Sequence, residues 1–145
     1  MKSTFVKEVR AFNRFYTNII GLLDKHILHS HYSLPEVRIM FELYHHAGLT
    51  ASDIIALIDI DKGYMSRLLK KFEKNKLILR ANSTTDKRAV FLRLSAKGEK
   101  EFEVLNKASD QQVEMLFKNL SDKECGELTQ KMSAIQKLLT KGLKK

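Results

Sequence analysis

The chain has 145 residues, of which 43% are hydrophobic and 30% are charged, which suits the core of one ordinary domain and shows too little bias for disorder. No stretch approaches the ~20 apolar residues of a membrane span, residues 1–5 lack the features of a signal peptide, and one cysteine excludes an internal disulfide. We therefore expect a cytoplasmic protein, and the formal net charge of +9 predicts an anionic partner.

The excess positive charge is concentrated in the middle of the chain. Residues 1–59 carry 6 basic and 6 acidic side chains, and residues 101–145 carry 8 and 7, whereas residues 60–100 carry 12 and 4, a net charge of +8. An ordinary solvated surface would spread such an excess over the whole chain. Its concentration predicts an element that binds phosphate groups.

Four helices are expected in the first half of the chain. Apolar residues at helical spacing predict one long helix over about 4–29. Capping boxes that begin at Ser33 and at Thr50 start a second helix and a short third one. A fourth helix is expected over 62–75, after a turn at 59–61. Two short helices and a tight turn therefore precede the basic region, as in a helix-turn-helix.

A hairpin and two further helices are expected in the second half. Residues 77–80 and 89–94 have strand-like composition, and the polar stretch between them predicts a turn with an exposed basic tip. A hairpin directly after a helix-turn-helix is a wing. Ser95 can cap the next helix, and a capping box at Ser121 begins a last helix with a coiled-coil-like apolar seam.

These elements predict a mainly α fold with a small β-wing, in which a winged helix-turn-helix is flanked by long N- and C-terminal dimerisation helices. We expect a single domain over 1–145, with a DNA-binding lobe over about 33–95 and dimerisation helices over 4–30 and 96–142. The flanking helices carry wide apolar stripes and have no second domain to cover. We therefore expect them to pack on each other and on a second copy in a two-fold dimer.

The helix over 62–75 has an apolar face made by Met65, Leu68, Leu69 and Phe72, with the basic residues opposite. The polar face is placed to meet base edges and phosphates, and an arginine at the hairpin tip suits a narrow minor groove. The residues that we expect to contact DNA are Thr50, Ser52, Lys62, Gly63, Tyr64, Ser66, Arg67, Lys70, Lys71, Arg80, Thr84, Asp86, Lys87 and Arg88.

The basic residues of this helix have an alternative interpretation without function, because any surface helix carries Lys and Arg opposite its core stripe. In the same way, a basic hairpin tip can be a solvated loop. The short helix before it and the hairpin after it favour DNA binding over that interpretation.

Several of these segments together resemble the MarR family of transcriptional regulators. They are residues 66–74, Leu77-Ile78, Asp86-Lys87-Arg88-Ala89 and Leu94-Ser95-Ala96-Lys97-Gly98, and the Asp-x-Arg wing followed by Leu-Ser-x-x-Gly is the most specific part. The resemblance covers essentially the whole chain. It implies a triangular homodimer on pseudo-palindromic operator DNA, an effector crevice between the dimerisation helices and the DNA-binding lobe, and a wing in which Asp86 orients Arg88.

Residues 9–16, 34–38 and 61–67 resemble more closely the N-terminal half of MarR-type regulators fused to a GNAT acetyltransferase. No Gly-rich pyrophosphate loop for acetyl-CoA is present, so we expect either a stand-alone relative or a fragment of a longer protein. The sequence departs from the family at Lys76, where a glycine usually follows the recognition helix. We expect Asn75 to adopt the left-handed cap instead.

Other candidate sites have weaker support. The candidates for the lining of an effector crevice are Tyr16, Ile20, Leu23, His31, Tyr32 and Met40, although apolar helical stripes are more often plain core. No catalytic arrangement stands out, and no cofactor is expected.

The histidines and the single cysteine also raise candidate sites. Surface or core histidines are favoured over a metal site, because no cysteine or carboxylate cluster completes a ligand set around His26, His29, His31, His45 and His46. Cys125 lies on the apolar stripe of the last helix, which favours a small buried hydrophobe over a redox sensor.

We therefore expect a sequence-specific transcriptional regulator, most simply a repressor, that binds an inverted repeat of double-stranded DNA as a homodimer and is released by a small-molecule effector. Two alternatives stay open. One is the regulatory half of a longer MarR–acetyltransferase fusion, and the other is a protein that binds nucleoid DNA or RNA without sequence preference.

Overall fold

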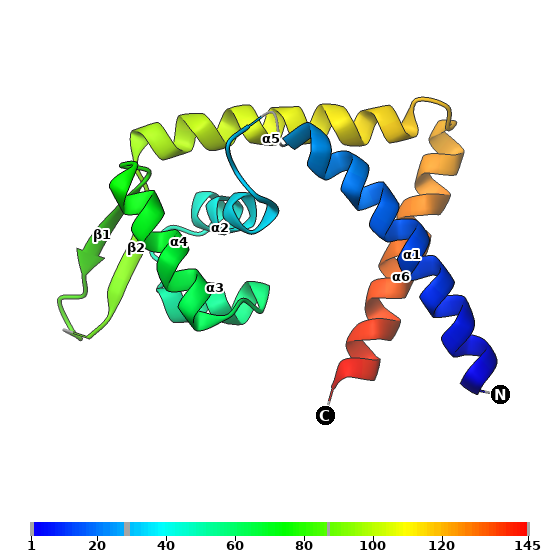
Figure 1. The fold of residues 1–145 in the computed structure, drawn as a ribbon, viewed down its shortest axis with the longest axis horizontal. Coiled ribbons are helices and arrows are strands. Elements are labelled where there is room, and N and C mark those ends of the chain that lie inside the picture. Colours follow the sequence, from blue (N-terminus) through cyan, green and yellow to red (C-terminus); the bar gives the residue numbers. More distant parts are fainter. Residues whose placement is uncertain (1, 28–29, 87, 145) are drawn as a thin grey trace. The chain divides into compact units, whose positions relative to one another are not determined.

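The computed structural model describes residues 2–27, 30–86 and 88–144, with residues 22–27 described by their backbone alone. These residues form a mainly helical fold with a two-stranded antiparallel sheet, as the sequence predicts (Figure 1). The chain divides into two compact units, Met1–Ser109 and Asp110–Lys145. No helix of the described residues is both long enough and apolar enough to cross a membrane. The elements are α1 (Lys2–Ile27), α2 (Leu34–His45), α3 (Ala51–Ile58), α4 (Lys62–Lys74), β1 (Ile78–Asn82), β2 (Val90–Leu94), α5 (Ala96–Phe117) and α6 (Asp122–Leu143).

The predicted helices all form, with small changes at their ends. Helix α1 begins at Lys2, two residues before the predicted start, and His29 lies outside the described residues. The capping boxes at Ser33, Thr50 and Ser121 are all present, each with the reciprocal side-chain and backbone hydrogen bonds. Each box fixes the N-terminus of its helix, because it satisfies backbone N–H groups that the first helical turn leaves unpaired.

The hairpin differs from its prediction at both ends of the turn. The ladder runs from Ile78 opposite Leu94 to Asn82 opposite Val90. The first strand therefore starts one residue later than predicted and ends two residues later, because ladder pairing uses backbone groups and tolerates a polar Asn82. Ala89 precedes β2 instead of joining it, since its N–H donates to the carbonyl of Asp86 at 3.1 Å.

The core of the first unit lies among α2, α3, α4, the hairpin and the start of α5. Phe102 of α5 is 1% exposed, and its ring centroid lies 4.7 Å from that of Tyr44 and 6.2 Å from that of Phe41, both on α2. The four residues predicted for the apolar face of α4 are all buried, so the predicted orientation of this helix is confirmed. The buried apolar residues are Ile39, Met40, Leu43, Ile54, Met65, Leu68, Leu69, Phe72, Leu77, Ile78, Leu92, Leu94, Phe102 and Leu105.

The left-handed residue after α4 is Lys76, and the prediction that Asn75 would take this conformation is wrong. Asn75 has φ −87°, whereas Lys76 has φ 59°. The N–H of Lys76 donates to the carbonyl of Glu73, and the N–H of Leu77 donates to the carbonyl of Phe72. This pair of hydrogen bonds is a Schellman motif, which requires the left-handed conformation one residue beyond the cap.

A tight junction follows, in which the start of α5 closes over the end of α4. The Ser95 hydroxyl donates to the carbonyl of Lys76 at 2.6 Å and accepts from the N–H of Gly98 at 3.0 Å. A Cβ atom on Gly98 would lie 2.2 Å from the carbonyl oxygen of Leu77. The Leu-Ser-x-x-Gly segment therefore joins the recognition helix and the wing to α5 through backbone contacts.

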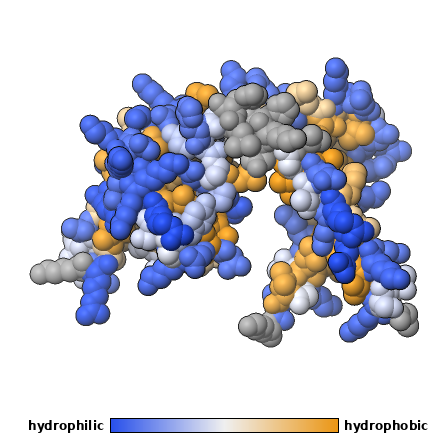
Figure 2. All heavy atoms as spheres, in the orientation of Figure 1, coloured by the Kyte–Doolittle hydropathy of each residue, from blue (hydrophilic) through white to orange (hydrophobic). Residues whose placement is uncertain are grey.

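Both long terminal helices expose apolar side chains within the single chain, and Figure 2 shows hydrophobic residues at the surface of α1 and α6. Helix α6 has no buried residue, and Cys125 is half-buried. On α1 the rings of Phe12 and Tyr16 stack with centroids 5.7 Å apart. The exposed apolar residues are Phe5, Val6, Val9, Phe12, Phe15, Tyr16 and Ile20 on α1, and Met132, Ile135, Leu138, Leu139 and Leu143 on α6.

Candidate nucleic-acid interface

The turn between α3 and α4 presents the N-terminus of α4 to solvent. Asp59 ends α3 in the left-handed conformation with φ 51°. Asp61 then caps α4, since its carboxylate accepts a hydrogen bond from the N–H of Tyr64 at 2.9 Å. The fixed cap places Lys62 and Gly63 in the exposed first turn, where the N–H groups and the helix dipole favour an anion.

The outer face of α4 is polar and exposed. Hydrophilic side chains dominate the region of α4 and the hairpin in Figure 2. The exposed polar residues and glycine of this helix are Lys62, Gly63, Ser66, Arg67, Lys70, Lys71 and Lys74.

Arg67 is held near the N-terminal end of this face. Its guanidinium carbon lies 5.7 Å from the ring centroid of Tyr64, which is within the range of a cation–π contact. A Cβ atom on Gly63 would lie 3.8 Å from a guanidinium nitrogen of Arg67 and 3.2 Å from the Asp61 carboxylate. The arginine therefore extends over the first turn, with its planar donor fork free of a carboxylate partner among the described residues.

Two of the predicted DNA contacts are held by carboxylates of the protein. The Lys71 ammonium lies 3.1 Å from Oε2 of Glu36 on α2, whose side chain is only 6% exposed. Arg80 of β1 forms an ion pair with Glu73 of α4, and both side chains are substantially exposed. Sequence patterning did not reveal either pairing, because both join residues of different elements.

The wing tip is organised by two side chains. The Ser83 hydroxyl accepts hydrogen bonds from the N–H groups of Thr85 and Asp86, at 3.2 and 3.1 Å. The Asp86 carboxylate in turn accepts from the backbone N–H of Arg88 at 3.0 Å. Arg88 and Thr84 are exposed, and Lys87 lies outside the described residues. Asp86 thus shapes the backbone at Arg88, leaving the arginine side chain exposed.

The start of α3 supplies the last predicted contacts. Ser52 is exposed, whereas Thr50 is half-buried and its hydroxyl accepts from the N–H of Asp53 at 3.1 Å. The hydrogen bonds that the Asp53 carboxylate receives from the backbone and side chain of Thr50 hold the pKa of Asp53 below its ordinary value. Thr50 therefore acts first as a helix cap.

The described residues thus combine a helix-turn-helix, whose second helix is basic, with a wing. A family model described as MarR family matches residues 32–90. Over this segment the chain belongs to the MarR family. The HTH-type transcriptional regulator MgrA of Staphylococcus aureus is 31% identical over 101 residues, which is 70% of this chain and 65% of MgrA. The chain therefore spans just under two thirds of the length of the curated relatives that it matches.

Solved structures have the same fold. One MarR family transcription regulator has a TM-score of 0.82 at 18% identity, covering 97% of this chain and 93% of that one. FabT of Streptococcus pneumoniae, solved in complex with DNA, has a TM-score of 0.79 at 17% identity, covering 94% of this chain and 98% of that one. MgrA and the first of these structures are named as transcription regulators, not as enzymes. The closer likeness to acetyltransferase fusions stays a prediction.

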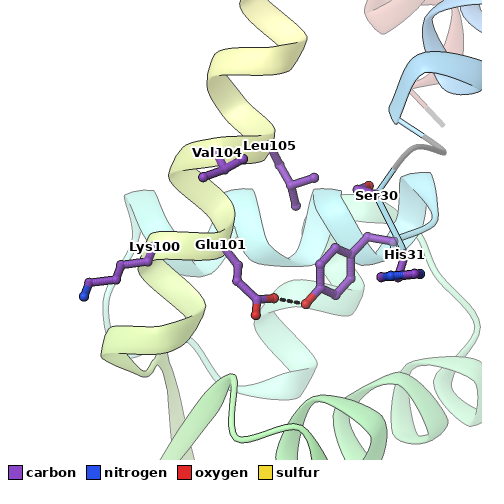
Figure 3. Close-up of a pocket in the computed structure, with 7 residues that line it drawn as sticks. Ser30, His31, Lys100, Glu101, Val104 and Leu105 are labelled. Carbon is purple, nitrogen blue, oxygen red and sulfur yellow. Dashed lines mark hydrogen bonds between the residues drawn. The ribbon is translucent and has the colours of Figure 1, made fainter.

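A pocket of about 400 Å³ lies between the segment before α2 and one side of α5. Glu101 and Leu105 point towards the same space as His31, whereas Lys100 extends away from it (Figure 3). The Tyr32 hydroxyl donates a hydrogen bond to Glu101 across the pocket. Burial, together with this bond and the nearby carboxylates of Glu101 and Glu36, raises the pKa of Tyr32 well above its ordinary value.

Only part of the predicted crevice lines this pocket. His31 and Tyr32 do, but Met40 is fully buried in the core, and Tyr16 and Ile20 are exposed on α1. The side chain of Leu23 lies outside the described residues. The prediction of the lining did not include Ser30 or the residues of α5, because the apolar pattern of a helix does not show which loop packs against that helix.

The histidines form no metal centre among the described residues, where no group of three His, Cys, Asp or Glu side chains is placed to hold an ion. His45 instead packs its ring 4.4 Å from that of Phe41, and His46 lies 3.9 Å from the Glu42 carboxylate. The side chain of His26 and all of His29 lie outside the description.

Proposed function

We propose that this chain is a sequence-specific DNA-binding transcriptional regulator that acts as a homodimer. The observation that carries the proposal is the outer face of α4, where Arg67 and Lys70 are exposed opposite a fully buried apolar face, next to an exposed wing. A cationic helix face of this kind fits the major groove, and a basic wing fits the adjacent backbone or minor groove. The DNA complex of FabT, which has the same fold, supports the same partner here.

The contacts divide by chemistry. Ser66 and Arg67 read base edges, with Arg67 bidentate to guanine. Gly63 and the N-terminal amides of α4 bind a phosphate, and Lys70 adds affinity without sequence information. Arg88 reaches the minor groove from the wing.

The apolar stripes of α1 and α6 support the dimer. Such long exposed stripes would be unusual for a monomer and match the isologous interface of a two-fold dimer. In this proposal residues 33–95 form the DNA-binding lobe of one MarR-type domain over 1–145, and residues 4–30 and 96–142 form the dimerisation helices. The operator is then an inverted repeat with half-sites about one helical turn apart.

The function extends to repression relieved by a small molecule. The pocket beside Tyr32 and Glu101 supports this part, because it has the volume for a small ligand and adjoins the loop that leads into the DNA-binding lobe. A reporter gene placed behind the selected operator, with and without the protein, distinguishes repression from activation.

Selection of sites from a random DNA pool with the purified protein tests the proposal. We expect an inverted repeat, and in gel-shift titrations Arg67→Ala should lose the preference for it over random DNA while remaining a folded dimer. Arg10→Ala removes another exposed arginine, on α1, and should bind as the wild type does. Equal affinity of the wild type for selected and random DNA would exclude sequence-specific recognition.

A further inference from the structure

The two flanks of α4 differ from its outer face, because each carries an ion pair to a neighbouring element. At 100° per residue, Lys71 lies about 110° to one side of the buried face and Glu73 about 90° to the other. Lys71 contacts Glu36 of α2, and Glu73 contacts Arg80 of β1. The residues that point directly away from the core are instead Gly63, Arg67, Lys70 and Lys74.

Glu36 is the unusual member of these pairs, because its carboxylate is buried. Oε1 accepts hydrogen bonds from the N–H and the hydroxyl of Ser33, at 3.2 and 3.0 Å. Oε2 is inaccessible to solvent and accepts no well-aligned hydrogen bond from the described residues, and the Lys71 ammonium 3.1 Å away supplies its counter-charge. Moving Lys71 to a DNA phosphate would leave a buried charge uncovered.

We propose that Lys71 is a positioning residue, which with Glu36 fixes the recognition helix against α2, and that it does not contact DNA. This inference rests on the proposed function. Arg80 differs, since its partner Glu73 is partly exposed and the pair can open at little cost. Lys70, one residue away on α4, has no carboxylate partner among the described residues and remains a phosphate contact.

The salt dependence of DNA binding distinguishes positioning from phosphate contact. The plot of log K against log salt has a negative slope, and each lost phosphate contact reduces the magnitude of this slope by about 0.9. We expect Lys71→Met to weaken binding to the selected operator without changing this slope. The matched Lys70→Met should make the slope less steep.

Glu36→Gln is the sharper variant, because it leaves every cation in place and retains an oxygen for Ser33. If Lys71 positions the helix, Glu36→Gln weakens operator binding by a factor similar to that of Lys71→Met, on the order of tenfold. The double variant should be no worse than either single one, because both residues act through one contact and, unlike Lys71→Met alone, it leaves no unpaired buried charge. It also keeps the test valid where Lys71→Met alone fails to fold.

The opposite result is equally specific. If Lys71 contacts phosphate, Glu36→Gln frees the lysine, and the affinity for the operator stays equal or rises. Lys71→Met then makes the salt slope less steep, as Lys70→Met does. Either finding overturns the inference while the wild type still binds its operator. Failure of the wild type to distinguish operator from random DNA would instead refute the proposed function, and the inference with it.

Discussion

Gly98→Ala should destabilise the protein strongly, although alanine is the better helix former. The added Cβ would lie 2.2 Å from the Leu77 carbonyl oxygen and 3.1 Å from its carbonyl carbon, whereas an ordinary carbon–oxygen contact is about 3.3–3.6 Å. The obstacle is backbone, so the junction has to open by about 1 Å. Such overpacking costs about 1–3 kcal/mol, and the loss of both Ser95 hydrogen bonds at the junction adds about 1 kcal/mol for each bond.

Against this loss stands a gain of about 1 kcal/mol from replacing glycine inside a helix. We therefore expect the free energy of unfolding to fall by about 2–4 kcal/mol, measured by urea denaturation at fixed protein concentration. Gly126→Ala is the matched control, because nothing lies within 4 Å of its added Cβ and it lies about 140° around α6 from the apolar stripe. That variant should gain up to about 1 kcal/mol. A Gly98→Ala protein as stable as the Gly126→Ala protein would refute the close approach at Leu77.

Three further outcomes follow from local geometry. Lys76→Gly should raise the free energy of unfolding by about 1 kcal/mol, because it relieves a left-handed residue, whereas Lys70→Gly in the interior of α4 should lower it by about 1 kcal/mol. The raised pKa of Tyr32 keeps its hydroxyl neutral in the folded state, while the unfolded chain ionises near the ordinary value of 10.0. Wild-type stability should therefore fall as the pH rises above this value, and the stability difference from Tyr32→Phe should shrink. Thr50→Ala should lose about 1 kcal/mol with its helix cap, and an unchanged urea midpoint would contradict the role of Thr50 as a cap.

Local sequence signals were enough to predict most of the fold. Each capping box is complete within four residues, so Ser33, Thr50 and Ser121 marked their helix starts without knowledge of the tertiary structure. The burial of the α4 face was equally predictable, since its spacing leaves one orientation that hides all four apolar residues. The strand-like segments after the recognition helix predicted a wing, the apolar stripes of the flanking helices predicted a dimer, and the resemblance to MarR regulators implied the same two features.

The rest depends on contacts between distant segments. The start of β1 and the left-handed Lys76 follow from where Leu77 finds its hydrogen-bond partners, and the nearest residues alone do not determine this. The glycine of the Leu-Ser-x-x-Gly segment was recognised as a motif, but its reason is the Leu77 carbonyl, 21 residues earlier in the chain. The pocket was only half predicted for the same reason, since its second wall comes from α5.

The net charge of the basic segment overstates the charge that can face DNA. Lys71 covers the buried Glu36, Arg80 pairs with Glu73, and the Lys97 ammonium donates to a backbone carbonyl at the end of α4. An exposed pair such as that of Arg80 contributes about 0–1 kcal/mol, so a phosphate can replace its partner. Lys71 cannot change partner in the same way, because Oε2 of its partner Glu36 has no access to water. The burial of the partner, and not the charge of the side chain, therefore decides which cations of this segment are available to DNA.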